Sequence, residues 1–231
     1  WNYPLYLAVG PLVASLAAGN RTMIKMSEYT PHTSALFKEL IEASFPEDLV
    51  SVINGEADVA ADFSSRPFDH LLFTGSTSVG KLVMKAAAEN LTPVTLELGG
   101  KSPAVVSPDV PMEDAAQRIA FGKAFNAGQT CIAPDYVLAP RHKVEAIAEA
   151  VLGQVETFFP DYGSDADYTA IISDKHHARL SAMIEEAREA GARVLQPEGS
   201  ESGNVRKLAP TVVIDPPAES QMMTEEIFGP I

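Results

Sequence analysis

Cys131, the single cysteine of the chain, is the first residue that could do chemistry. Gly128 precedes it by three residues and gives the backbone freedom beside the thiol. A thiolate is a strong nucleophile, and nearby backbone N–H groups can favour the thiolate and stabilise an oxyanion. The alternative is a small buried hydrophobic residue, which is the common state of a free cysteine. One cysteine also disfavours a structural zinc site and cannot form an internal disulfide.

Glu97 is the second candidate, because its carboxylate lies between Leu96 and Leu98 and directly precedes two glycines. Acidic residues are rarely buried without a partner or a purpose. Burial would raise the pKa of Glu97 and make it a usable general base near neutral pH. The alternative is a structural carboxylate that pairs with Lys101 or with another cation.

The segment Phe73-Thr74-Gly75-Ser76 lies between an expected strand and an expected helix. A glycine there lets the backbone approach a ligand, and the free N–H groups of a helix start attract phosphate. An ordinary tight turn with Ser76 as the N-cap explains the same residues equally well. The usual nucleotide fingerprints are absent, because residues 75–80 lack a middle glycine and Thr95 occupies a position where a phosphate loop requires glycine.

Alternating helices and strands must position these residues in the first half of the chain. The patterns predict helices at 4–18, 31–44, 57–63 and 77–89, and strands at 22–25, 49–53, 70–73 and 94–96. This alternation predicts a parallel, doubly wound α/β sheet, in which ligands bind at the carboxyl ends of the strands. Ser27-Glu28, Gly55 and Gly75-Ser76 follow those ends, so they form one plausible ligand edge.

The pattern breaks at Gly99-Gly100, which marks a crossing point. Beyond it we expect an irregular segment around Cys131 and a polar loop at 199–204. The remaining expected elements are helices at 112–125, 142–159 and 173–190, and strands at 104–107, 136–139, 193–195 and 211–214.

Composition narrows the class of protein. The chain has 231 residues, 46% of them hydrophobic and 21% charged, which is typical of a globular protein. A net charge of −14 disfavours nucleic acid as a partner. No apolar run reaches the roughly 20 residues that span a membrane, and no signal peptide is apparent, so we expect a cytoplasmic protein. The chain begins without methionine and stops inside a structured segment, so we expect a fragment of a longer polypeptide.

Six short motifs, in order, resemble those of the aldehyde dehydrogenase superfamily. Residues 126–136 look most like the branch that holds fatty and aromatic aldehyde dehydrogenases, in particular coniferyl aldehyde dehydrogenase. The motifs are Trp-Asn-Tyr-Pro at 1–4, Lys-Met-Ser-Glu at 25–28, Phe-Thr-Gly-Ser at 73–76, Leu-Glu-Leu-Gly-Gly-Lys-Ser-Pro at 96–103, Gly-Gln-Thr-Cys at 128–131 and Glu-Glu-Ile-Phe-Gly-Pro at 225–230.

The resemblance implies a role for each matching residue. Cys131 is the nucleophile, Glu97 is the general base, and the Asn2 amide forms the oxyanion hole with the backbone N–H of Cys131. The resemblance also implies NAD or NADP as cofactor, with no metal. The cofactor-binding residues that it implies are Lys25 and Glu28 at the adenosine ribose, Gly55 on the adenine side, Ser76 at the pyrophosphate, Glu226 at the nicotinamide ribose, Phe228 near the nicotinamide, and also Phe73, Gly75 and Leu98.

The resemblance further implies a Rossmann-type cofactor domain at residues 1–96 and an α/β catalytic domain at 97–231, each incomplete. The implied reaction is oxidation of an aromatic, coniferyl-like aldehyde to the acid, with a medium- or long-chain aliphatic aldehyde as the alternative substrate. Glu97 favours water over coenzyme A as the acyl acceptor. The implied assembly is a homodimer or homotetramer. A cofactor-free thiol hydrolase and a non-catalytic module are the competing classes of protein.

Overall fold

The computed structural model describes residues 1–197 and 206–231. The polar loop expected at 199–204 lies outside the described residues. The chain divides into two compact units, Trp1–Leu98 and Gly99–Ile231. The division falls at the Gly99-Gly100 break, close to the domain boundary expected from the sequence, while the roles of the two units stay predictions.

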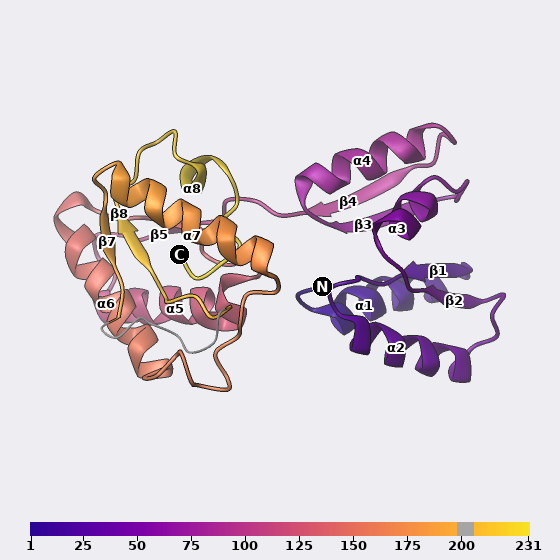
Figure 1. The fold of residues 1–231 in the computed structure, drawn as a ribbon, viewed down its shortest axis with the longest axis horizontal. Helices are drawn as coiled ribbons and strands as arrows, with labels where there is room; N and C mark the ends of the chain where they lie inside the picture. The colour runs from indigo at the N-terminus through magenta and orange to yellow at the C-terminus, as the bar shows by residue number, and fades with distance from the viewer. Residues whose placement is uncertain (198–205) are drawn as a thin grey trace. The chain divides into compact units, whose positions relative to one another are not determined.

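Unit 1 alternates helices and strands as expected, and its strands pair in parallel (Figure 1). β1 pairs with β2, and β3 pairs with β4. Within the described residues these are separate two-stranded sheets rather than the single continuous sheet that we expected. The elements are α1 (Pro4–Ala17), β1 (Thr22–Lys25), α2 (Pro31–Ser44), β2 (Val50–Ile53), α3 (Ala57–Ser64), β3 (Leu71–Gly75), α4 (Thr77–Ala88) and β4 (Val94–Leu98).

Local signals set the ends of these helices. α1 begins at Pro4, where the missing N–H of proline is tolerated, and the chain leaves the helix through Gly19 at a φ of 80°. Ser76 caps α4 by accepting a hydrogen bond from the Val79 N–H. The expected N-cap of α2 is different, because the Thr30 side chain makes no capping bond and its hydroxyl instead donates to the carbonyl of Ser27.

Each strand pair of unit 1 is covered by a helix. α4 packs on β3 and β4, and α1 and α2 pack on β1 and β2 (Figure 1). Because the strands of each pair run parallel, their carboxyl ends lie at the same edge, with Lys25 opposite Ile53 and Gly75 opposite Leu98. The buried core beneath β1 and β2 consists of Leu12, Met26, Phe37, Ile41, Val50 and Val52.

Unit 2 is built on three longer helices, which pack through two hydrophobic clusters. β5 and β6 pair in parallel, whereas β7 and β8 are antiparallel. The short helices η1, η2 and α8 were not predicted. The elements are β5 (Pro103–Val105), α5 (Met112–Ala124), η1 (Phe125–Gly128), β6 (Tyr136–Leu138), η2 (Arg141–Lys143), α6 (Val144–Phe158), α7 (Asp174–Glu189), β7 (Arg193–Leu195), β8 (Val212–Ile214) and α8 (Gln221–Thr224).

None of the helices in the described part of the chain combines the length and the apolar character needed to cross a bilayer.

Candidate functional site

Cys131 follows a sharp turn at the end of α5. Asn126, Ala127 and Gly128 all adopt left-handed backbone angles, with φ values of 51°, 49° and 71°. Non-glycine residues rarely adopt this conformation, so it marks a backbone that its surroundings hold in place. A Cβ atom on Gly128 would lie 2.2 Å from the carbonyl oxygen of Gly229, so the close approach of these two segments requires glycine at position 128.

The Gln129 side chain anchors this turn through hydrogen bonds, a role that the sequence analysis did not predict. Its side chain is buried, and its amide nitrogen donates to the carbonyls of Asn126 and Ala170 at 3.1 and 3.2 Å. Its amide oxygen accepts from the N–H of Ile172 at 3.0 Å. An anchored loop of this kind leaves Cys131 exposed. The alternative of a buried, inert cysteine is therefore wrong for this structure.

Glu97 is exposed, so the expectation of a buried carboxylate is wrong. Successive side chains of a strand point to opposite faces. Leu98 faces α4, where a Cβ on Gly80 would lie 2.8 Å from its Cδ2 atom, and Leu96 shares that face. Glu97 therefore lies on the other face, which no helix of unit 1 covers. The suggested partner Lys101 pairs instead with Asp135.

Asn2 lies half-buried directly before α1. It belongs to unit 1 together with Glu97, whereas Cys131 belongs to unit 2. The shared role of these three residues stays a prediction.

The β1–β2 edge brings together three of the predicted cofactor residues. Lys25 ends β1, and its ammonium lies 3.0 Å from the Glu28 carboxylate. Partial burial acts to raise the pKa of Glu28, but a backbone hydrogen bond and the Lys25 ammonium outweigh it and hold the pKa below its usual value. Gly55 follows the neighbouring β2, and a Cβ there would lie 2.6 Å from Val59 of α3. The edge therefore presents an ionised carboxylate at neutral pH.

The β3–β4 edge brings together Phe73, Gly75, Ser76 and Leu98. The ring of Phe73 lies so close to Gly75 that an added Cβ would come within 2.5 Å of it. Ser76 is exposed and caps α4, so the turn-and-cap interpretation of the sequence is confirmed. The first N–H groups of a helix have no partners within the helix, so the same start also suits an anion. Phosphate binding here stays a prediction.

Glu226 and Phe228 lie in unit 2 on a segment that comes close to the Cys131 turn through Gly229. A Cβ on Gly99 would lie 1.8 Å from the Glu226 Oε2 atom, so the carboxylate rests against glycine backbone. Burial and the nearby Asp135 carboxylate raise the pKa of Glu226, although a hydrogen bond from the Gly100 N–H acts in the opposite direction. Phe228 has a left-handed φ of 54°, so its backbone is also held in an unfavourable conformation.

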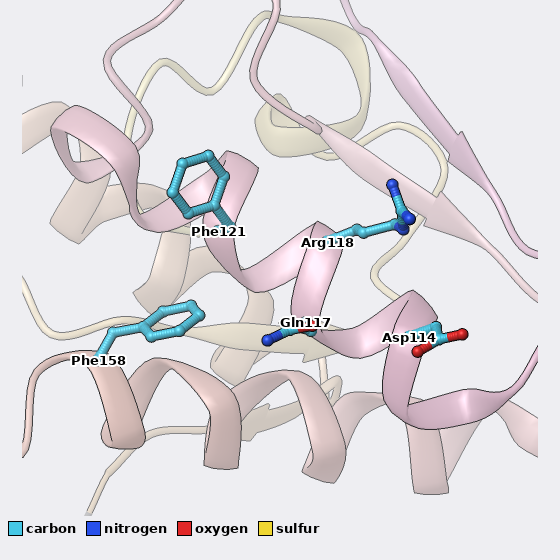
Figure 2. A pocket seen from close by; sticks show the side chains of 5 residues that line it. All are labelled: Asp114, Gln117, Arg118, Phe121 and Phe158. Atoms are coloured by element: carbon cyan, nitrogen blue, oxygen red, sulfur yellow. The ribbon is translucent and has the colours of Figure 1, made fainter.

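A separate hollow of about 410 Å³ lies between α5 and α6 and involves none of the predicted site residues. Figure 2 shows the ring of Phe121 on α5 and that of Phe158 on α6 at this hollow. Its other lining residues are Asp114, Gln117 and Arg118. In the described ranges 1–197 and 206–231, no group of three or more His, Cys, Asp or Glu side chains is arranged to hold a metal ion.

Comparison with known proteins gives a consistent result. The model of the aldehyde dehydrogenase family matches residues 1–231. The chain is 58% identical over 231 residues to a probable coniferyl aldehyde dehydrogenase of Pseudomonas aeruginosa, and 47% identical over 235 residues to a coniferyl aldehyde dehydrogenase of a Pseudomonas species. Both matches cover the whole chain, but only 48% and 49% of the relatives. The chain thus spans about half the length of the curated relatives that it matches.

Solved structures agree. The chain is similar to the substrate-bound AldH of Staphylococcus aureus, with a TM-score of 0.88 and 39% identity, over all of this chain and 50% of that one. It is also similar to an aldehyde dehydrogenase of Mycobacterium tuberculosis complexed with NAD+, with a TM-score of 0.86 and 35% identity, over all of this chain and 49% of that one. These similarities confirm the expected fold class.

Proposed function

Because the chain belongs to the aldehyde dehydrogenase family, we propose that the full-length protein oxidises an aldehyde to a carboxylic acid with NAD or NADP as the hydride acceptor. The observation that carries this proposal is the exposed Cys131 directly after a turn that the hydrogen bonds of Gln129 and the close approach at Gly128 hold in place. A nucleophile must be accessible and fixed in position, and this cysteine has both properties.

The chain's own residues supply the steps on the substrate. The Cys131 thiolate attacks the aldehyde carbon and forms a C–S bond, and the carbonyl oxygen becomes an oxyanion. The backbone N–H of Cys131 and the amide of Asn2 stabilise that oxyanion, and removal of one such donor typically lowers the rate on the order of a hundredfold or more. The nicotinamide, when bound, would accept the hydride that leaves the aldehyde carbon. Loss of hydride leaves a thioester on Cys131.

Glu97 then completes the reaction by taking a proton from water. The water oxygen attacks the thioester carbon, the C–S bond breaks, and the electron pair returns to the Cys131 sulfur. The exposed position of Glu97 on β4 leaves its carboxylate accessible to water. Asn2, Glu97 and Cys131 must meet at one aldehyde for these steps, and this convergence is part of the proposal.

Taken one at a time, groups of each unit have the chemistry that one part of a dinucleotide requires, which supports the proposed cofactor. The Glu28 carboxylate, ionised beside Lys25, suits the hydroxyls of the adenosine ribose. The start of α4 at Ser76 suits a pyrophosphate. The Glu226 carboxylate, cradled by Gly99, suits the nicotinamide ribose. Similar chains support both cofactors, since one was solved with NAD+ and a mouse relative at 43% identity is named dimeric NADP-preferring.

An aromatic aldehyde of the coniferyl type is the proposed substrate, supported by relatives at 58% and 47% identity that carry that name. An aliphatic aldehyde is the second candidate, because a similar structure at 28% identity was solved with NAD+ and octanal. We also propose a homodimer or homotetramer in the cytoplasm. A panel of aromatic and aliphatic aldehydes, assayed on the full-length protein by NADH and NADPH absorbance, separates the substrate classes.

Two variants test the mechanism in the same assay. Cys131→Ala should abolish aldehyde oxidation, whereas Glu97→Gln should release about one NADH per site in a burst and then stall at the thioester. Oxidation that survives Cys131→Ala would disprove the proposal. A protein that hydrolyses activated esters but shows no fluorescence change with NAD or NADP would be the cofactor-free thiol hydrolase.

A further inference from the structure

The segment of residues 225–230 carries Glu226 and Phe228, yet it forms neither helix nor strand. Backbone groups outside regular structure need other partners when they are buried. Here side-chain cations supply them. The Lys101 ammonium donates to the carbonyls of Met222 and Glu225 at 2.7 and 3.1 Å.

Two further cations continue the pattern along the segment. The Arg179 guanidinium donates to the carbonyls of Glu226 and Ile227 at 3.2 and 2.5 Å. The Lys123 ammonium donates to the carbonyl of Gly229 at 3.3 Å. Five carbonyls of residues 222–229 thus accept hydrogen bonds from cations on other parts of unit 2.

The Asp135 carboxylate also contacts this segment, and its side chain is only 4% exposed. One carboxylate oxygen pairs with the Lys101 ammonium, and the other accepts from the Ile227 N–H at 2.9 Å. The backbone N–H of Asp135 also donates to the carbonyl of Ser102 at 2.8 Å. A single buried carboxylate therefore binds both the cation that holds residues 222 and 225 and the backbone of residue 227.

We propose that Lys101 and Asp135 are positioning residues, which hold the backbone of residues 222–227 so that the Glu226 carboxylate rests against Gly99 and Gly100 and is presented to the cofactor. This inference rests on the proposed function, in which Glu226 binds the nicotinamide ribose. A carboxylate held ready in place binds a ribose with less loss of conformational freedom on binding.

The chemistry of the pair favours positioning over a purely stabilising role. Replacing a buried ion pair by well-packed apolar side chains is often neutral or stabilising, so such a pair is weak evidence for stability. An apolar pair cannot donate to two carbonyls or accept from an N–H group, whereas Lys101 and Asp135 do both. A methyl group at position 99 would also displace the Glu226 carboxylate from its present place, because an added Cβ would lie 1.8 Å from Oε2.

The double variant Lys101→Met/Asp135→Asn tests the proposal in the full-length protein. It removes both charges, so neither is left buried without its partner. We expect a folded protein with a Kd for NAD or NADP weakened about tenfold or more. We also expect faster amide hydrogen exchange in residues 222–230, while alkylation of Cys131 by iodoacetamide without cofactor stays within about twofold of the wild type.

Lys143→Met is the matched control, because it also removes a lysine that donates to a backbone carbonyl, that of Pro108 at 2.5 Å. It should leave cofactor affinity unchanged. Gly99→Ala provides a second variant that alters no charge, and it should weaken cofactor binding by displacing Glu226. Gly153→Ala on α6 is its control, since no atom lies within 4 Å of an added Cβ there.

Unchanged cofactor affinity and unchanged exchange in the double variant would overturn the inference. If the double variant does not fold, wild-type affinity in Gly99→Ala would overturn it. A wild-type protein that binds neither NAD nor NADP would overturn the proposed function instead. Faster amide hydrogen exchange in the double variant would then still show that Lys101 and Asp135 stabilise the backbone of residues 222–227.

Discussion

The two units place their predicted cofactor residues in different ways. In unit 1 the Lys25–Glu28 pair joins residues three apart in the sequence, at the end of one strand, and the Lys25 and Glu28 side chains are 10% and 30% exposed. In unit 2 the Lys101–Asp135 pair joins residues 34 apart, and the Lys101 and Asp135 side chains are 19% and 4% exposed. A local pair depends on one turn of chain, whereas the distant pair depends on the folding of the whole unit.

This difference has an energetic consequence. Partly exposed ion pairs contribute about 0–1 kcal/mol, because water already solvates the charges well. A buried hydrogen-bond donor left without its acceptor costs about 1–3 kcal/mol in addition. The Asp135 carboxylate is the acceptor of the buried Ile227 N–H, and no such bond depends on the Glu28 side chain in unit 1. Unit 2 should therefore be the more sensitive of the two to a change in a single charged residue.

Asp135→Ala should give the largest effect on stability. The buried Ile227 N–H loses its acceptor and the partly exposed Lys101 ammonium loses its counter-ion, so we expect a loss of about 1–4 kcal/mol in the free energy of unfolding. Urea denaturation of the full-length protein, followed by circular dichroism, measures it. A loss no greater than that of Glu28→Gln would contradict the contrast between the two units.

Lys123 should give unit 2 a pH dependence of its own. Burial, reinforced by the charge of Lys101 and opposed by Asp135 and Glu226, lowers the pKa of Lys123 from 10.5 to about 8. The unfolded chain therefore binds more protons than the folded protein between these values, so Lys123 makes stability rise with pH across this window, by at most about 3 kcal/mol.

Lys123→Met removes this contribution. The unfolding free energy of the wild type minus that of the variant should increase between about pH 8 and about pH 10.5. The difference is read from urea denaturation, and other groups that titrate in this range cancel between the two proteins. A difference that stays flat with pH would show that Lys123 keeps an ordinary pKa in the folded protein.

The sequence predicted the elements of unit 1 well because their signals are local. Pro4, Gly19 and Ser76 mark helix ends through their own backbone and capping properties. The prediction from sequence was wrong where the exposure of a side chain depends on elements distant in the chain. Glu97 has leucines on both sides, but strand alternation turns it to the face that no helix of unit 1 covers.

The supporting residues of unit 2 could not be predicted from local pattern. Lys101 was considered only as a partner for Glu97, and Asp135 carried no signal, because their contact with residues 222–227 spans about ninety or more positions. Gln129 was part of a recognised motif, but its anchoring bonds reach Ala170 and Ile172. Family motifs therefore indicated the reacting groups, while the groups that hold them appear only in the folded structure.

Glu28→Gln should give the smallest change in stability, under about 1 kcal/mol, and a clear change in cofactor preference. The ionised carboxylate repels the 2′-phosphate of NADP, so its removal should strengthen NADP binding relative to NAD by several-fold. Fluorescence titration with both cofactors measures the ratio of the two Kd values. Glu42→Gln is the control, because it removes an exposed pair with Lys38 on α2 and should leave that ratio unchanged. An unchanged ratio in Glu28→Gln would show that the 2′-phosphate does not approach this carboxylate, and the β1–β2 edge would lose its place in the proposed cofactor site.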